Sequence, residues 1–217
     1  MTALLALAIA LALNPPPPGD CTASPPIQAT RESGPLSLSV EVYGGLSVLR
    51  VTGGIAAGAT DQVRLALDET DVDEVWFDSA GGDREEAKQL GGLLRRAGLL
   101  TRVPASATCA GACVDAFLGG IARLVDPSAE IGVAAMPVSD QASAQSQAER
   151  EQAAGRWAER QADHYIRAGI SRGLLRLQLE TPAGTTCWLT RAAQQRYNVT
   201  NAPLIRPAST PPSLPRP

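Results

Sequence analysis

A chain of 217 residues, of which 44% are hydrophobic, can form one domain of ordinary size with a substantial core and short tails. Its formal net charge is −3, and its 19 lysines and arginines form no basic stripe in the sequence. This balance argues against nucleic acid as the main partner.

The N-terminus begins with an apolar run over 3–13 (ALLALAIALAL). This run is too short for a membrane-spanning helix, which needs about 20 residues, but it is typical of the apolar part of a secretory signal peptide. We therefore predict a signal peptide over 1–20, a linker over 21–34 and a periplasmic or secreted mature protein without a stable membrane span. The alternative, because no basic residue precedes the run, is an apolar N-terminal tail.

Cysteine usage fits export, because an even number of cysteines in an oxidising compartment indicates disulfides. The four are Cys21, Cys109, Cys113 and Cys187, which allow three pairings. We prefer Cys109–Cys113 with Cys21–Cys187, since the second bond would tie the N-terminal segment to the body of the protein. A zinc site is the alternative, but the CxxxC spacing and the single histidine disfavour it, so we expect no metal and no cofactor.

The folded body is expected to span 35–202 and to begin with a β-hairpin. Apolar and polar residues alternate over 36–42 and 46–52, as in half-buried strands, and a Tyr-Gly-Gly turn separates the two segments. Helices and strands then alternate up to residue 136. We predict helices over 59–69, 83–97 and 112–120, and strands over 73–79, 99–104, 106–108, 122–126 and 130–136. This alternation predicts an α/β fold with parallel strands.

The C-terminal part is predicted to be mostly helical. The polar segment 143–168 has only scattered apolar residues, so we expect an exposed helix there. A helix over 171–179, a strand over 187–189 and a helix over 190–197 follow. The tail over 203–217 is rich in proline and is predicted to be disordered.

Two turns stand out because each connects a strand to a helix through small residues. They are Ser79-Ala80-Gly81-Gly82 and Cys109-Ala110-Gly111-Ala112. Binding sites of α/β folds gather where strands end and helices begin. Exposed backbone N–H groups at such positions can bind an oxyanion.

The segments that contain these turns resemble the ClpP/crotonase superfamily, and especially its exported ClpP-like proteins. The stretch 78–103 (DSAGGDREEAKQLGGLLRRAGLLTRV) is similar to the SPGG turn with the helix and strand that follow it. The stretch 109–136 (CAGACVDAFLGGIARLVDPSAEIGVAAM) is similar to the nucleophile turn, its helix and the strand with the histidine. The closing WLTRAAQQRYNVTN also resembles the family, and the likeness covers about 46–200. The resemblance implies a spiral of ββα units.

The resemblance also assigns the catalytic positions, and the residues found there are unusual. The serine position of the family falls on Gly111, and the histidine position falls on Ala134. The acidic position would lie near 180–182, where only Glu180 could fill it. Glycine and alanine provide neither a nucleophile nor a base, both of which a serine peptidase needs. The main-chain oxyanion donors can remain, namely the N–H of Gly81 or Gly82 and that of Ala112.

Other side chains are not expected to replace the missing groups. Ser106 and Thr108 precede the turn and would point elsewhere, and Cys113 is expected to be buried or disulfide-bonded. His164 is expected on the surface of the polar helix. The carboxylates beside the first turn are interpreted as a strand end, Asp78, and a helix N-cap, Asp83.

Three functions remain open. The first is an exported pseudoenzyme that binds a peptide or protein segment, or serves assembly. The second is a crotonase-type enzyme that acts on a thioester with backbone oxyanion donors alone. The third is a hydrolase with displaced catalytic residues. The resemblance also implies self-association as a homo-oligomer, although the polar helix over 143–168 offers no strong apolar stripe for it.

Overall fold

The computed structural model describes residues 19–22, 34–135, 146–182 and 184–203. The segment interpreted as a signal peptide lies almost wholly outside these residues, as do most of the linker and the tail from residue 204 onward. Within the part of the chain that is described, no helix is both long and apolar enough to cross a membrane.

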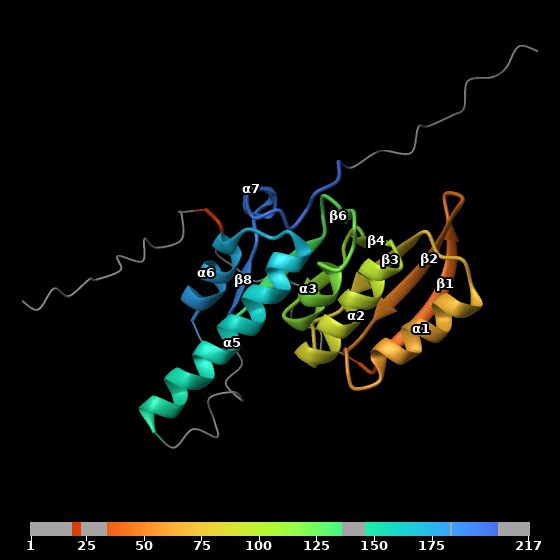
Figure 1. Cartoon of the computed structure of the whole chain (residues 1–217). Coiled ribbons are helices and arrows are strands. Elements are labelled where there is room, and N and C mark those ends of the chain that lie inside the picture. Colours follow the sequence, from red (N-terminus) through yellow and green to blue (C-terminus); the bar gives the residue numbers. More distant parts are fainter. Residues whose placement is uncertain (1–18, 23–33, 136–145, 183, 204–217) are drawn as a thin grey trace, which may run out of the picture.

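A five-stranded sheet forms the larger layer of the fold (Figure 1). Its strands lie in the order β1-β2-β3-β4-β6 and have these bounds: β1 Ser37–Tyr43, β2 Leu46–Thr52, β3 Glu74–Asp78, β4 Leu100–Val103 and β6 Arg123–Val125. The predicted hairpin is confirmed, because β1 pairs antiparallel with β2. The remaining neighbours are parallel, as the strand–helix alternation predicts.

A second sheet of three strands continues from the end of the first. It has the order β5-β7-β8, with β5 Thr108–Ala110, β7 Glu130–Ala134 and β8 Thr186–Trp188. The strand predicted at 106–108 is wrong in position, because Ser106 lies in a turn with φ 64°. The pairing of Cys109 and Ala110 with β7 extends the strand through residues too small to show a period-two pattern.

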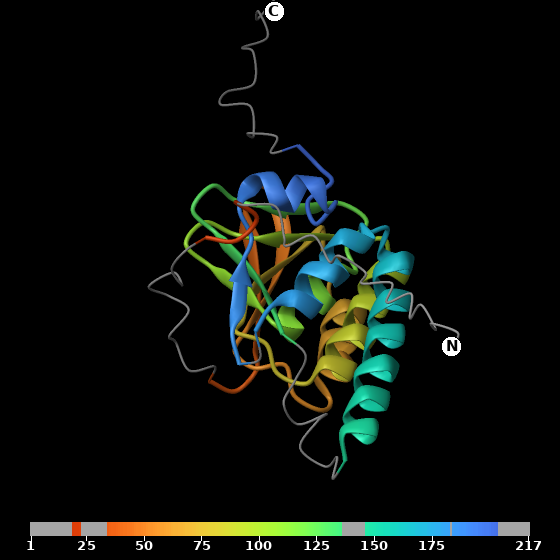
Figure 2. The ribbon, with the colours of Figure 1, turned by 90° about the vertical axis from the view of Figure 1, so that its left-hand side faces the viewer.

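Helices cover one face of the larger sheet (Figure 2). The predicted helices here are confirmed as α1 Ala59–Glu69, α2 Arg84–Arg96 and α3 Ala112–Phe117. In both ribbon views α2 lies beside α1, and α5 (Gln147–Ala168) lies on the other side of α2. Helix α3 is buried over its whole length. Asp83 is the N-cap of α2, and its carboxylate accepts a hydrogen bond from the backbone N–H of Glu86 at 2.9 Å.

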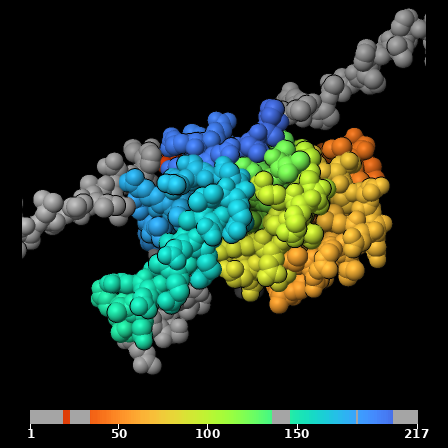
Figure 3. All heavy atoms as spheres, viewed as in Figure 1, coloured from red at the N-terminus to blue at the C-terminus, as the bar shows by residue number. Residues whose placement is uncertain are grey.

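Helix α5 differs from the exposed helix that the sequence predicts. One of its faces is buried, and the residues on it are Trp157, Gln161, Tyr165 and Ala168. Their spacing of three or four residues places them in one row on the helix. The apolar pattern alone does not indicate this row, because the glutamine interrupts it. Figure 3 shows the outer surface of α5 next to that of α2.

The C-terminal elements and the disulfides close the fold. Helix α6 spans Arg172–Glu180, and α7 spans Arg191–Arg196. The disulfides Cys21–Cys187 and Cys109–Cys113 are both present, in the pairing that we preferred from the sequence. The first bond places residue 21 beside β8, where the N–H of Thr22 donates to the carbonyl of Trp188 at 2.8 Å. Residues 19–22 therefore belong to the folded body.

Candidate functional site

The turn from β5 into α3 has the backbone shape of a nucleophile turn. Gly111 has φ 54° and ψ −122°, and α3 begins at the next residue. Its N–H donates to the carbonyl of Gly132 in β7 at 2.9 Å, which fixes the turn against the second sheet. A sharp strand-to-helix turn of this kind presents a nucleophilic serine in many hydrolases, and its backbone is strained for a residue with a side chain. Glycine adopts it without that strain.

The two positions that the resemblance assigns to serine and histidine face each other. A Cβ atom placed on Gly111 would lie 3.7 Å from the Cβ of Ala134 and 3.7 Å from the carbonyl oxygen of Ala80. Among the described residues outside the immediate chain neighbours, no other heavy atom comes within 4 Å of that point. Both residues are partly exposed.

The turn over 79–82 contains the first of the predicted oxyanion donors. The N–H of Gly81 donates to the hydroxyl of Ser79 at 3.1 Å and is therefore already used. The carbonyl of Gly81 and the N–H of Asp83 both bond to Ile55. Gly82 is therefore the bridged residue of a parallel pair, and its own N–H points away from Ile55. Gly82 is exposed, so its N–H is the donor that this turn offers to a ligand.

The second donor is the N–H of Ala112 in the first turn of α3, where backbone N–H groups have no partner within the helix. The two donors come from turns that touch. A Cβ on Gly81 would lie 3.1 Å from the nitrogen of Ala112 and 2.9 Å from the carbonyl oxygen of Ala110, so only glycine fits there. The N–H of Ala110 also donates to the carbonyl of Ser79 at 3.0 Å.

Glu180, the candidate for the acidic position, lies in α6 together with Gln178. Glu180 ends α6, and its carboxylate accepts a hydrogen bond from Nε of Arg176 at 2.9 Å. The residue of α6 that reaches β7 is Gln178, whose Nε2 donates to the carbonyl oxygen of Ala134 at 2.9 Å. Its Oε1 accepts from the hydroxyl of Tyr165 at 3.0 Å, and burial raises the pKa of that phenol well above its usual range. A neutral amide thus stands beside the histidine position.

The other candidate side chains have structural roles. The sulfur of Cys113 is in the disulfide with Cys109, and both residues are buried. The carboxylate of Asp78 accepts a hydrogen bond from the N–H of Thr108 at 3.1 Å. No group of three histidine, cysteine or carboxylate side chains in the described ranges could hold a metal ion.

His164 is not the surface residue that the polar helix suggests. Its side chain is only 13% exposed, and its Nε2 lies 3.1 Å from the main-chain oxygen of Asp115 in α3. Burial lowers the pKa of His164 below 6.5. Asp115 opposes this shift in pKa, while the nearby positive charges of Lys88 in α2 and Arg167 in α5 add to it.

The lowered pKa of His164 predicts a pH dependence of stability. The unfolded chain takes up the proton more readily than the folded protein, so the wild type should lose stability as the pH falls below about 6.5. The variant His164→Gln should lack this loss. Urea unfolding of both proteins between about pH 7.5 and pH 5 measures the difference between their free energies of unfolding at each pH. The contribution of the carboxylates is nearly the same in both proteins, so it largely cancels in this difference. A difference that does not change with pH would contradict the shift.

The fold is shared with solved structures that have little sequence identity to this chain. A mutant of the membrane-bound stomatin-specific protease 1510-N superposes with a TM-score of 0.50 and 14% identity, over 70% of this chain and 75% of that one. ClpP1 from Listeria monocytogenes superposes with a TM-score of 0.50 and 16% identity, over 70% of this chain and 88% of that one. The chain has the ClpP/crotonase fold.

A further ClpP/crotonase-type structure, a methylmalonyl CoA decarboxylase, gives a TM-score of 0.37 and 10% identity, over 46% of this chain and 48% of that one. No family model matches the sequence, and no curated protein matches it either. At these identities the comparisons establish the ClpP/crotonase fold, and the chemistry has to be argued from the site itself.

At the positions that the resemblance assigns to the catalytic groups, the structure holds glycine and alanine within turns of well-defined backbone geometry. Two backbone donors, the N–H groups of Gly82 and Ala112, come from adjoining turns, and the backbone of Gly111 keeps the shape of the nucleophile turn. Such donors stabilise a carbonyl oxygen and any charge that develops on it. Gly111 supplies no nucleophile, and Ala134 supplies no base.

Proposed function

We propose that the protein is an exported, non-catalytic member of the ClpP/crotonase fold that binds an extended peptide or protein segment at this site. The observation that carries the proposal is the facing pair of Gly111 and Ala134, within a turn whose backbone is otherwise intact. A serine hydrolase needs an oxygen nucleophile and a base to accept its proton. Neither residue can supply them.

Several features support a peptide as the ligand. The two N–H donors match a peptide carbonyl, which binds through main-chain hydrogen bonds irrespective of its side chains. One protein that shares the fold is described as a stomatin-specific protease, and a protease takes a polypeptide into its site. The two disulfides are compatible with a secreted protein.

The substitution Ala134→Leu tests the proposal, because it places a larger side chain into the space that faces Gly111. We expect it to weaken binding of a fluorescein-labelled, permanently unfolded polypeptide at least about tenfold, a loss of roughly 1.4 kcal/mol. Fluorescence anisotropy gives the dissociation constants. The matched control is Ala148→Leu on the exposed side of α5, which should bind like the wild type.

Other outcomes would identify the alternatives. Turnover of an acyl thioester by the wild type would favour the crotonase-type enzyme, since that chemistry uses the backbone donors without a serine. Covalent labelling of the wild type by a fluorophosphonate would show a hydrolase with displaced residues. If neither occurs and no peptide binds, the peptide-binding role is wrong although the site is still inert.

A further inference from the structure

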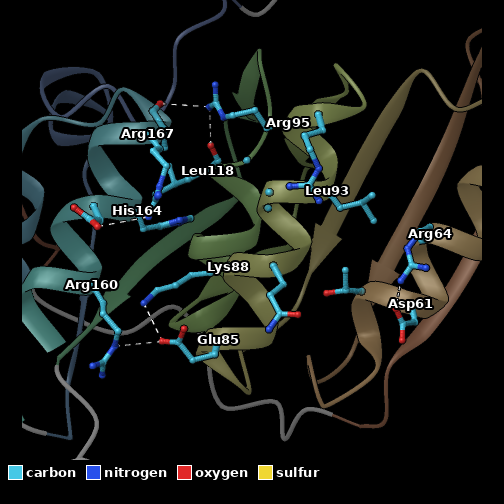
Figure 4. Close-up of a pocket in the computed structure, with 18 residues that line it drawn as sticks. Asp61, Arg64, Glu85, Lys88, Leu93, Arg95, Leu118, Arg160, His164 and Arg167 are labelled. Atoms are coloured by element: carbon cyan, nitrogen blue, oxygen red, sulfur yellow. Dashed lines mark hydrogen bonds and ion pairs between the residues drawn. The ribbon is translucent and has the colours of Figure 1, made fainter. Parts of the chain in front are cut away.

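A groove on the helical face lies apart from the Gly111 site. It runs between α1, α2 and α5 and has a volume of about 740 Å³ (Figure 4). None of the residues of the two turns at 79–82 and 109–112 lines it. Binding sites for small molecules commonly enclose roughly 300–1,000 Å³, so the groove has the size of such a site.

The lining of the groove is strongly basic. Six arginine or lysine side chains line it, against three carboxylates, which gives a local net charge of +3 with His164 neutral. The whole chain has a net charge of −3. The six are Arg64, Lys88, Arg95, Arg96, Arg160 and Arg167. They come from three helices that are distant in the sequence, which is why no basic stripe is visible there.

The charges are unevenly paired on the side of α5. Nζ of Lys88 lies 3.2 Å from Oε1 of Glu85, and Nε of Arg160 lies 3.8 Å from the same oxygen. One carboxylate therefore faces two cations. The side chain of Lys88 is only 12% exposed, so it is held in the wall of the groove. An anion entering the groove would supply the missing counter-charge.

The excess of positive charge also affects the pKa of His164, which lies in the same wall of the groove. Both Lys88 and Arg167 lower its pKa, in addition to the effect of burial, and only Asp115 opposes them. Figure 4 shows His164 between Lys88 and Arg167 along this wall. A negative charge bound beside His164 would be attracted to Lys88 and Arg167.

We propose that this groove binds a small anionic ligand that carries carboxylate or phosphate groups. Arg160 and Arg167 lie on α5, and Lys88 lies on α2, so an anion between the two helices can contact both. A long polyanion is disfavoured, because beyond the groove it would meet a chain whose remaining net charge is negative. The inference does not depend on the peptide-binding role of the Gly111 site.

The test uses the fact that His164 is the only histidine of the chain. Its imidazole signals in an NMR spectrum of the full-length protein report on this groove alone. Citrate, tripolyphosphate and inorganic phosphate are titrated at constant ionic strength up to about 10 mM, which covers millimolar affinities. We expect a saturable shift of the His164 signals, and the comparison of citrate with the phosphates identifies the preferred anionic group.

Charge variants of opposite expected effect separate binding from a general disturbance. The double variant Arg160→Gln/Arg167→Gln removes two side chains that are more than half exposed, and it should weaken binding about tenfold. Glu85→Gln removes the shared carboxylate and should tighten binding by about threefold. The matched control is Arg150→Gln, which lies on the exposed first part of the same helix and outside the groove.

Three results would overturn the proposal. The first is the absence of a saturable His164 shift with any of the three anions. The second is an equal dissociation constant for the wild type and the double variant. The third is a His164 shift that only an oligoglutamate peptide or an oligonucleotide produces, because the occupant would then be a macromolecule.

Discussion

The double variant Gly111→Ser/Ala134→His should react covalently with a fluorophosphonate probe, while the wild type should not. The turn already holds residue 111 in the conformation of a nucleophile turn, with the N–H donors of Gly82 and Ala112 beside it. A hydroxyl at 111 would have room, because its Cβ would meet only the Cβ of Ala134 and the carbonyl oxygen of Ala80 at ordinary contact distance. Intact-mass and peptide mass spectrometry locate the label.

The single variant Gly111→Ser separates the contribution of the hydroxyl to labelling from that of the base. Gly111→Ser alone supplies a hydroxyl without a base, and we expect it to label about a hundredfold or more slowly than the double variant. It should also cost about 1–3 kcal/mol of stability, because a side chain is strained at φ 54°. Gly155→Ser in α5 is the matched control, since a Cβ there meets nothing within 4 Å. An unlabelled but folded double variant would show that the oxyanion donors or the facing positions are misassigned.

The sequence allows the frame of this site to be predicted, because its parts have strong local signals. The hairpin of β1 and β2 has a clear period of two, and α2 has both an amphipathic pattern and the N-cap Asp83. Gly81 and Gly82 of the first turn mark places where no side chain fits. The residue pattern alone therefore locates position 111 at the start of a buried helix.

What could not be predicted depends on contacts between distant segments. The residue that reaches Ala134 is Gln178, two positions before Glu180, and only the packing of α6 on β7 decides between them. The buried face of α5 contains Gln161, which is polar by type but is buried because it hydrogen bonds to Asp115. The basic groove likewise arises only when three helices come together.

A buried carboxylate in α3 gives the second large effect. Asp115 is 1% exposed and lies one helical turn after Gly111. Its Oδ2 accepts a hydrogen bond from Nη1 of Arg84 at 3.0 Å, and its Oδ1 accepts one from Nε2 of Gln161 at 2.7 Å. The guanidinium of Arg84 is itself largely buried and lies 5.7 Å from the ring centre of Trp157. Asp115 thus joins α3 to both α2 and α5.

We expect Asp115→Ala to lower the free energy of unfolding by about 3–5 kcal/mol, because it leaves the charge of Arg84 buried without a partner. Urea unfolding at neutral pH measures this loss. Asp163→Ala is the control, since Asp163 forms an exposed ion pair with Arg167 and should change stability by less than about 1 kcal/mol. An equal effect of the two substitutions would contradict the role of the buried pair.

A compensating variant separates the charge from the volume of the side chain. Asp115→Leu/Arg84→Met removes both charges of the pair while it keeps apolar volume between α2 and α3, so it should recover much of the loss that Asp115→Ala causes. Because α3 begins at the nucleophile turn, Asp115→Ala should also slow the fluorophosphonate labelling of the double variant at 111 and 134. Recovery of stability without recovery of labelling would show that Asp115 positions the turn through its charge and not only through packing.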